Sequence, residues 1–115
     1  MLTQLTAISP IDGRYYDKTK GLSEIFSEYG LIFHRVLVEI RFIQTLSESN
    51  QIAKCARLSK DDNQYLENLL VNFDIEQAQL VKDIESKTNH DVKAVEYYLK
   101  EKFKYSQSLV ALSEF

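Results

Sequence analysis

The first residues that could do chemistry lie in a turn near the N-terminus. Asp12-Gly13 is a strong turn pair, and Pro10 disfavours a helical conformation at the residue before it. Such a turn can aim the planar guanidinium of Arg14 and the phenol of Tyr15 at a phosphate group. The alternative is an ordinary surface turn whose arginine pairs with a nearby carboxylate.

A second group, Thr88-Asn89-His90-Asp91, has the composition of a helix start. The first turn of a helix carries N–H groups without helical partners and the positive end of the helix dipole, so it suits an anionic ligand. Asn89 adds an amide, and His90 adds a ring, neutral by default, that can hydrogen-bond or move a proton. The alternative is that Thr88 and Asp91 only cap the helix and His90 has no functional role. Capping does not account for Asn89 and His90, so both interpretations stay open.

Other patterns that would indicate a particular chemistry are not found in the sequence. It contains no phosphate-binding glycine loop, nucleophile elbow or zinc-protease helix. With Cys55 as the single cysteine, neither an intrachain disulfide nor a cysteine-based zinc site can form. His34 and His90 are the only histidines, and we expect His34 to be a partly buried structural residue. The residue set therefore argues against a metal site.

The composition limits the class of protein. The chain has 115 residues, enough for one domain, with 14 Lys and Arg against 17 Asp and Glu. A net charge of -3 gives no excess of cations to neutralise a phosphate backbone, so we expect no nucleic-acid partner. The sequence shows neither a signal peptide nor an apolar run long enough to cross a bilayer, so we expect a cytoplasmic protein without membrane contact.

The elements that position these residues are predicted to be helices, because 3 Gly and 1 Pro leave few breaks. An extended lead-in over residues 1–16 precedes a short helix over 16–26 and a long one over 29–48. After a polar loop over residues 49–58, capping patterns predict helix starts at Ser59, Asp74 and Thr88. A further apolar segment covers residues 106–115.

The long helix is apolar on two sides. One stripe contains Phe33, Val36, Leu37, Ile40 and Ile43, and the opposite side contains Leu31, Val38 and Phe42. A helix of this kind is usually covered on both faces. We therefore expect either a partner or further parts of the same protein against its second face.

Taken together, three stretches are similar to a known family. LTAISPIDGRY (residues 5–15), FSEYGLIFHRVLVEIRFIQ (26–44) and above all TNHDVKAVEYYLKEK (88–102), followed by LSEF, resemble the N-terminal region of the bacterial adenylosuccinate lyases. These enzymes belong to the fumarase and aspartase superfamily. The resemblance covers nearly the whole chain and is weakest over residues 47–80. It implies an all-α fold, with residues 1–115 as an N-terminal helical domain cut before the central helical bundle.

The resemblance also implies a function. Family members cleave adenylosuccinate to AMP and fumarate, and the succinylated aminoimidazole carboxamide ribotide to its carboxamide ribotide and fumarate, without cofactor or metal. By position, Arg14 and Tyr15 match residues that hold the nucleotide phosphate. Asn89, His90 and Asp91 match the stretch that lines the substrate near the succinyl group. The members form homotetramers whose active sites draw residues from several subunits.

The principal catalytic groups of the family have no counterpart in this chain. In the family, a serine on a mobile glycine- and serine-rich loop removes the β-proton, and a separate histidine protonates the departing nitrogen. We therefore expect substrate-binding residues but no catalytic acid or base here. The alternative from another class is a free-standing helical module that binds a protein partner through the long helix.

Overall fold

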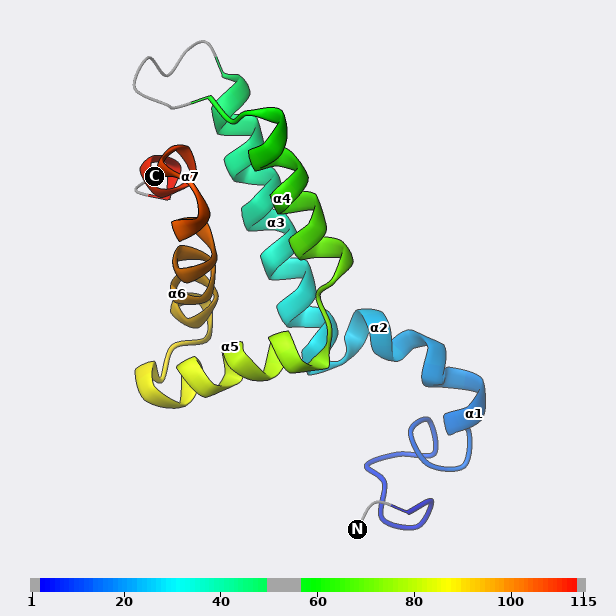
Figure 1. The fold of residues 1–115 in the computed structure, drawn as a ribbon. Coiled ribbons are helices and arrows are strands. Elements are labelled where there is room, and N and C mark those ends of the chain that lie inside the picture. Colours follow the sequence, from blue (N-terminus) through cyan, green and yellow to red (C-terminus); the bar gives the residue numbers. More distant parts are fainter. Residues whose placement is uncertain (1–2, 50–56, 114–115) are drawn as a thin grey trace. The chain divides into compact units, whose positions relative to one another are not determined.

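The computed structural model describes residues 3–49 and 57–113, which are drawn in colour in Figure 1. All regular structure within these ranges is helical and no strand occurs, which confirms the predicted all-α class. No helix in the described ranges is long and apolar enough to cross a membrane. Most of the predicted loop over residues 49–58, including Cys55, lies outside the described residues. The chain divides into two compact units, Met1–Leu31 and Ile32–Phe115, which we describe in turn.

The described start of the first unit, residues 3–15, is a run of turns and bends instead of an extended segment. The Asp12 carboxylate holds it together by accepting the backbone N–H of Ser9, with an N–O distance of 2.8 Å. This hydrogen bond is the main reason that the pKa of Asp12 is lowered. Gly13 is buried inside the turn, where an added Cβ would lie 2.9 Å from the carbonyl oxygen of Gln4. The turn therefore requires a glycine at this position.

The helix predicted over residues 16–26 is divided into three short segments. They are α1 (Tyr16–Thr19), the 3₁₀ turn η1 (Lys20–Leu22) and α2 (Ser23–Phe26). Gly21 lies in the middle segment and disfavours a continuous helix through its backbone entropy. The side chains predicted to form the apolar side, Leu22, Ile25 and Phe26, are 51%, 54% and 79% exposed. The predicted apolar side of this segment is therefore exposed.

The second unit contains the longer helices. They are α3 (Glu28–Glu48, whose first residues are counted with the first unit), α4 (Lys60–Val71), α5 (Ile75–Thr88) and α6 (Asp91–Lys102), followed by the 3₁₀ turn η2 (Phe103–Tyr105) and α7 (Gln107–Leu112). Figure 1 shows α4 running back along α3 and α5 crossing to the start of α6. The antiparallel direction follows from the contacts of Arg41 with Glu67 and of Gln44 with Asn63.

Capping by the residues that the sequence predicts sets two of the three helix starts. Before α4, the Ser59 hydroxyl accepts the N–H of Asp62 at 3.0 Å, and the Asp62 carboxylate accepts the N–H of Ser59 at 3.2 Å. Before α5, the Asp74 carboxylate accepts the N–H of Gln77 at 3.0 Å. Both starts confirm the prediction, and the third start, before α6, differs from it.

The core of the second unit receives side chains from all of its helices. The buried apolar residues are Ile32, Val36, Ile40, Ile43 and Leu46 on α3, Leu66 and Leu70 on α4, Phe73, Ala78 and Val81 on α5 and its approach, Ala94, Val95, Tyr98 and Leu99 on α6, and Phe103, Leu109 and Leu112 after it. The predicted inner stripe of α3 is confirmed at Val36, Ile40 and Ile43. On the opposite side of the same helix, Val38 is 64% and Phe42 is 48% exposed.

Aromatic packing fixes α5 against α6. The Phe73 ring, in the link before α5, packs edge-on against the Tyr98 ring of α6, with 6.0 Å between ring centres. The Tyr98 hydroxyl donates a hydrogen bond of 2.6 Å to the side-chain oxygen of Gln77 on α5. Burial raises the pKa of Tyr98 to about 12. These contacts attach the start of α5 to the middle of α6.

Candidate functional site

The first candidate group, Arg14 and Tyr15, forms one side-chain pair at the end of the N-terminal turn. The guanidinium Nη2 of Arg14 donates a hydrogen bond of 2.7 Å to the phenol oxygen of Tyr15. The guanidinium carbon also lies 4.6 Å from the centre of the Tyr15 ring. Both side chains are exposed, so the other N–H groups of the guanidinium are accessible to an anion.

A hollow of about 420 Å³ opens beside this pair. It is lined by Thr3, Gln4, Asp12, Gly13, Arg14, Tyr16 and Asp17. The carboxylates of Asp12 and Asp17 oppose an anion, but the first accepts backbone N–H groups and the second lies 3.7 Å from the ammonium of Lys20. Because small-molecule sites commonly measure about 300–1,000 Å³, the hollow has room for a phosphate beside the guanidinium.

The second candidate group lies at the junction of α5 and α6 in the second unit. Asn89 follows α5 with φ 54° and ψ 29°, the left-handed conformation that often ends a helix. Its backbone N–H donates to the carbonyl of Glu85 at 2.8 Å. Asparagine is one of the few residues that adopt this conformation readily. Asn89 therefore has a structural role, and its exposed side-chain amide is still accessible to a ligand.

His90 is the N-cap of α6, which corrects the prediction that Thr88 caps this helix and that His90 has no part in capping. The His90 Nδ1 atom accepts the backbone N–H of Lys93 at 3.4 Å. Thr88 is the last residue of α5, and its hydroxyl oxygen accepts the N–H of His90 at 3.3 Å. An Nδ1 atom that accepts a hydrogen bond carries no proton, so the neutral ring bears its proton on Nε2. His90 can then donate from Nε2 to an anionic oxygen.

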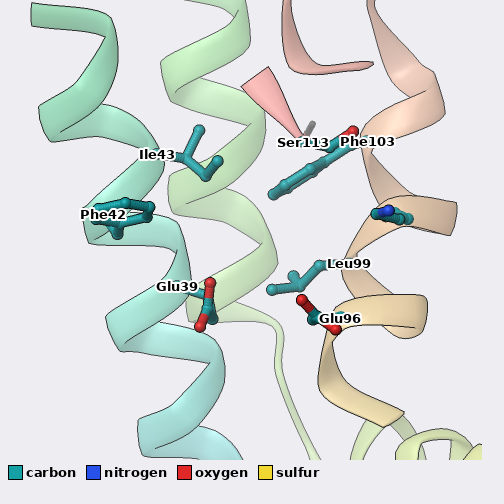
Figure 2. Close-up of a pocket in the computed structure, with 8 residues that line it drawn as sticks. Glu39, Phe42, Ile43, Glu96, Leu99, Phe103 and Ser113 are labelled. Carbon is teal, nitrogen blue, oxygen red and sulfur yellow. The ribbon is translucent and has the colours of Figure 1, made fainter. Parts of the chain in front are cut away.

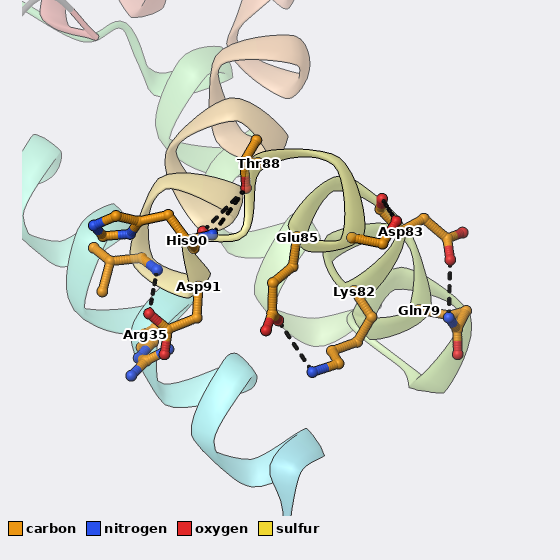
Figure 3. A network of polar contacts seen from close by, with 10 residues as sticks. Arg35, Gln79, Lys82, Asp83, Glu85, Thr88, His90 and Asp91 are labelled. Carbon is orange, nitrogen blue, oxygen red and sulfur yellow. Dashed lines mark hydrogen bonds and ion pairs between the residues drawn. The ribbon is translucent and has the colours of Figure 1, made fainter.

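Asp91 is engaged on both of its carboxylate oxygens. Oδ1 accepts the N–H of Val92 at 2.8 Å, and Oδ2 accepts a hydrogen bond of 2.9 Å from Nη1 of Arg35 on α3. The Arg35 guanidinium is the main reason that the pKa of Asp91 is lowered, with the Val92 hydrogen bond next. Figure 3 shows this ion pair beside His90. Arg35 is 56 residues away in sequence, and no pattern in the sequence could have linked the two.

These contacts change the interpretation of the helix start. The N–H groups of Val92 and Lys93 are taken by the side chains of Asp91 and His90, so the first turn of α6 does not offer them to an anion. An anion at this junction would instead meet the amide of Asn89 and the Nε2–H of His90. A ligand at this junction would therefore meet side-chain donors more than the end of the helix.

A second hollow, between α3, α6 and the segment after α6, is too small for a nucleotide. It measures about 70 Å³ and is lined by Glu39, Phe42, Ile43, Glu96, Leu99, Lys100, Phe103 and Ser113 (Figure 2). The Glu96 carboxylate within it lies 3.0 Å from the ammonium of Lys93. His34 is exposed, which corrects the expectation of partial burial, and its ring packs edge-on against Phe33. No group of side chains suited to a metal ion occurs in residues 3–49 and 57–113.

Comparison with known proteins gives one consistent result. No profile of a known protein family matches the chain. Proteins named adenylosuccinate lyase from Vibrio cholerae and Escherichia coli are each 49% identical to it over 114 residues, which is 99% of this chain and 25% of theirs. The protein of that name from Haemophilus influenzae is 48% identical over the same length.

The chain thus spans about a quarter of the length of the curated relatives that it matches. The similarity extends through both candidate groups, because it covers all but a residue of the chain. Over almost its whole length, the chain is thus homologous to a part of the proteins named adenylosuccinate lyase.

Proposed function

We propose that this chain forms the N-terminal helical part of a longer enzyme that cleaves adenylosuccinate to AMP and fumarate. A second reaction of the same kind cleaves the succinylated aminoimidazole carboxamide ribotide to its carboxamide ribotide and fumarate. The observation that carries this proposal is 49% identity over 114 residues to proteins named adenylosuccinate lyase. We further propose a cytoplasmic homotetramer that acts in purine biosynthesis and needs neither cofactor nor metal.

Arg14 and Tyr15 are suited to hold the nucleotide phosphate as a pair. Because the Tyr15 oxygen accepts a hydrogen bond from Arg14, its own O–H proton remains available for a phosphate oxygen. The exposed guanidinium supplies further N–H donors together with its positive charge. A phosphate in the adjoining hollow could accept hydrogen bonds from Arg14, which lines the hollow, while Tyr15, which does not line it, contacts the guanidinium.

Asn89, His90 and Asp91 are suited to the succinyl end of the substrate. The Nε2–H of His90 and the amide of Asn89 can each donate to a carboxylate oxygen. The Asp91 carboxylate, which would repel such a group, is paired with Arg35. We assign these residues to binding and orientation, and we assign neither the base that takes the β-proton nor the acid that protonates the nitrogen to this chain.

The phosphate role is tested by Arg14→Ala in the longer protein that carries this chain. A hydrogen bond to a charged group contributes about 1.5–3 kcal/mol, so KM for adenylosuccinate should rise about 10- to 100-fold. Lys104→Ala is the matched control, because Lys104 is an exposed cation whose ion pair with Glu101 lies outside the hollow and outside residues 89–91. Equal KM values for the two variants would contradict the phosphate role.

The role of His90 is tested by a substitution that keeps the helix cap. Asparagine is a favoured N-cap residue, so His90→Asn should preserve the unfolding midpoint while removing the Nε2–H donor. Turnover should fall at least tenfold, whereas His34→Asn, at an exposed histidine of α3, should leave it unchanged. Normal turnover with His90→Asn would show that His90 only caps α6 and contradict its role in binding.

A free-standing interaction module is the second candidate, favoured by the exposed Val38 and Phe42 on α3. The two candidates differ in the mass of the native protein, determined from peptides of this region. A product several times larger than this chain, with lyase activity, supports the enzyme. A native product of 115 residues that binds a protein through α3 would support the module and contradict the enzyme.

A further inference from the structure

We propose that Arg35 of α3 is a positioning residue for the candidate succinyl-binding group, because it holds Asp91 and with it the start of α6. This inference rests on the proposed function. Arg35 does not belong to the residues that the family resemblance assigns to the site. Its guanidinium Nη1 lies 2.9 Å from Oδ2 of Asp91, and Figure 3 shows the pair next to His90.

The start of α6 has no packed side chain of its own to hold it. Residues 89–93 are all exposed, and Ala94 is the first buried residue of the helix. The other hydrogen bonds described above for residues 89–91 join residues at most four apart in sequence, so they shape the junction without attaching it to another helix. The contact with Arg35 attaches it to α3 across 56 residues.

The same ion pair also compensates the negative charge of Asp91 next to the place where an anionic ligand would bind. An unpaired Asp91 carboxylate beside the donors of Asn89 and His90 would repel the carboxylates of a succinyl group. The Arg35 guanidinium compensates this charge at 2.9 Å and also favours the ionised form of Asp91. Arg35 thus fixes both the position and the charge of the junction without itself touching the substrate.

Because the ion pair is exposed, its role in positioning the junction can be distinguished from a role in global stability. The Arg35 and Asp91 side chains are 30% and 48% exposed, and ion pairs at such positions contribute little to global stability. Displacement of a substrate-binding group by about 1 Å can nevertheless cost about 100-fold in rate. The loss of Arg35 should therefore reduce activity much more than it reduces the unfolding midpoint.

The experiment compares Arg35→Ala with Arg41→Ala in the longer protein that carries this chain. Arg41 is the matched control, because it lies on the same helix and forms an exposed ion pair with Glu67 of α4, away from the junction. For Arg35→Ala we expect kcat/KM to fall about 10- to 100-fold with most of the loss in kcat, and Arg35→Lys to recover part of it. Arg41→Ala should stay within about twofold of the parent protein.

Hydrogen exchange provides a readout that does not depend on activity. In Arg35→Ala the amide protons of Val92 and Lys93 should exchange faster, because the first turn of α6 has lost its attachment to α3. They should be unaffected in Arg41→Ala. Unchanged exchange in Arg35→Ala would overturn the positioning role.

The failures of the two proposals are distinguishable. An active parent protein in which Arg35→Ala and Arg41→Ala have equal kinetics would overturn the role of Arg35 and leave the proposed function standing. An inactive parent protein would overturn the proposed function and the kinetic role of Arg35 with it, and the exchange data would still report whether Arg35 holds the start of α6.

Discussion

The two candidate groups are held in place by different forces. Arg14 and Tyr15 follow a turn that is closed by the Asp12 carboxylate and by backbone hydrogen bonds, and none of the described apolar side chains before Ile32 is buried. The junction at residues 89–91 instead connects two helices that bury side chains in a common core. Hydrogen bonds exposed to water stabilise less than packed apolar area, so the turn can be distorted without unfolding the core.

This difference predicts where substitutions act. In the first unit they should alter the geometry of the site and leave the cooperative unfolding of the protein nearly unchanged. In the second unit a core substitution should lower global stability and affect the site only through it. Substitutions at four residues, with controls at two further positions, test this contrast, beginning with the largest expected effect.

The largest effect is expected in the core of the second unit. Leu66 is fully buried, so Leu66→Ala should lower the free energy of unfolding by about 2–5 kcal/mol through lost apolar contact and the cavity left behind. Val71→Ala, at a 79% exposed position of the same helix, should change it by less than about 0.5 kcal/mol. Urea denaturation measures both. Similar values for the two variants would contradict the assignment of the core.

The pH dependence of stability tests the buried Tyr98. Its pKa is raised to about 12 by burial, whereas the ordinary pKa of a tyrosine in an unfolded chain is about 10. Stability from this group is therefore complete below pH 10 and is lost as the pH rises through 12, by on the order of 2 kcal/mol. Tyr98→Phe should flatten this part of the pH profile of unfolding. An unchanged profile would show that the hydroxyl is not buried.

An intermediate effect is expected at the turn in the first unit. A Cβ at position 13 would lie 2.9 Å from the carbonyl oxygen of Gln4, so Gly13→Ala should displace Arg14 and raise KM for adenylosuccinate about tenfold. Gly21→Ala is the control, because no atom lies within 4 Å of the added Cβ and alanine favours helix by about 1 kcal/mol. The two variants should share one global unfolding midpoint within about 2 °C. A large drop for Gly13→Ala would mean that the turn belongs to the core.

At Asn89 we expect an effect on stability smaller than that of Leu66→Ala, and two variants separate the structural role of this residue from a role in binding. Glycine accepts the left-handed conformation, so Asn89→Gly should leave the free energy of unfolding within about 0.5 kcal/mol, and Asn89→Ala should lower it by about 1–2 kcal/mol. Both variants lack the amide, so turnover should fall alike if the amide binds substrate. Full activity of Asn89→Gly would show that Asn89 serves only to end α5 and does not bind substrate.

The helices of the second unit could be predicted because their signals are local. The inner stripe of α3 at Val36, Ile40 and Ile43 follows helical spacing, and Ser59 and Asp74 are residues that commonly cap helices. The start of α6 was assigned to the wrong residue, because the cap is a histidine and histidine is not a typical N-cap. The sequence predicts one helix over residues 16–26, and the low helix propensity of Gly21 is only a weak sign that this segment is divided.

Contacts between distant residues could not be predicted. The pairing of Arg35 with Asp91 depends on how α3 and α6 pack, and a single sequence carries no sign of it. The turn and the predicted helix start indicated Arg14, Tyr15 and His90 as candidates, the family resemblance supplied their expected roles, and their detailed contacts came from the structure. The prediction of one domain over residues 1–115 stays a prediction, as do the homotetramer and the roles of the site residues.

The most direct test of the central claim is the rate of fumarate release from adenylosuccinate by the protein that carries this chain in its native source. We predict steady release of fumarate and AMP in equal amounts, without added metal or cofactor. A pure native protein that contains this chain and releases no fumarate from adenylosuccinate would contradict the proposed function.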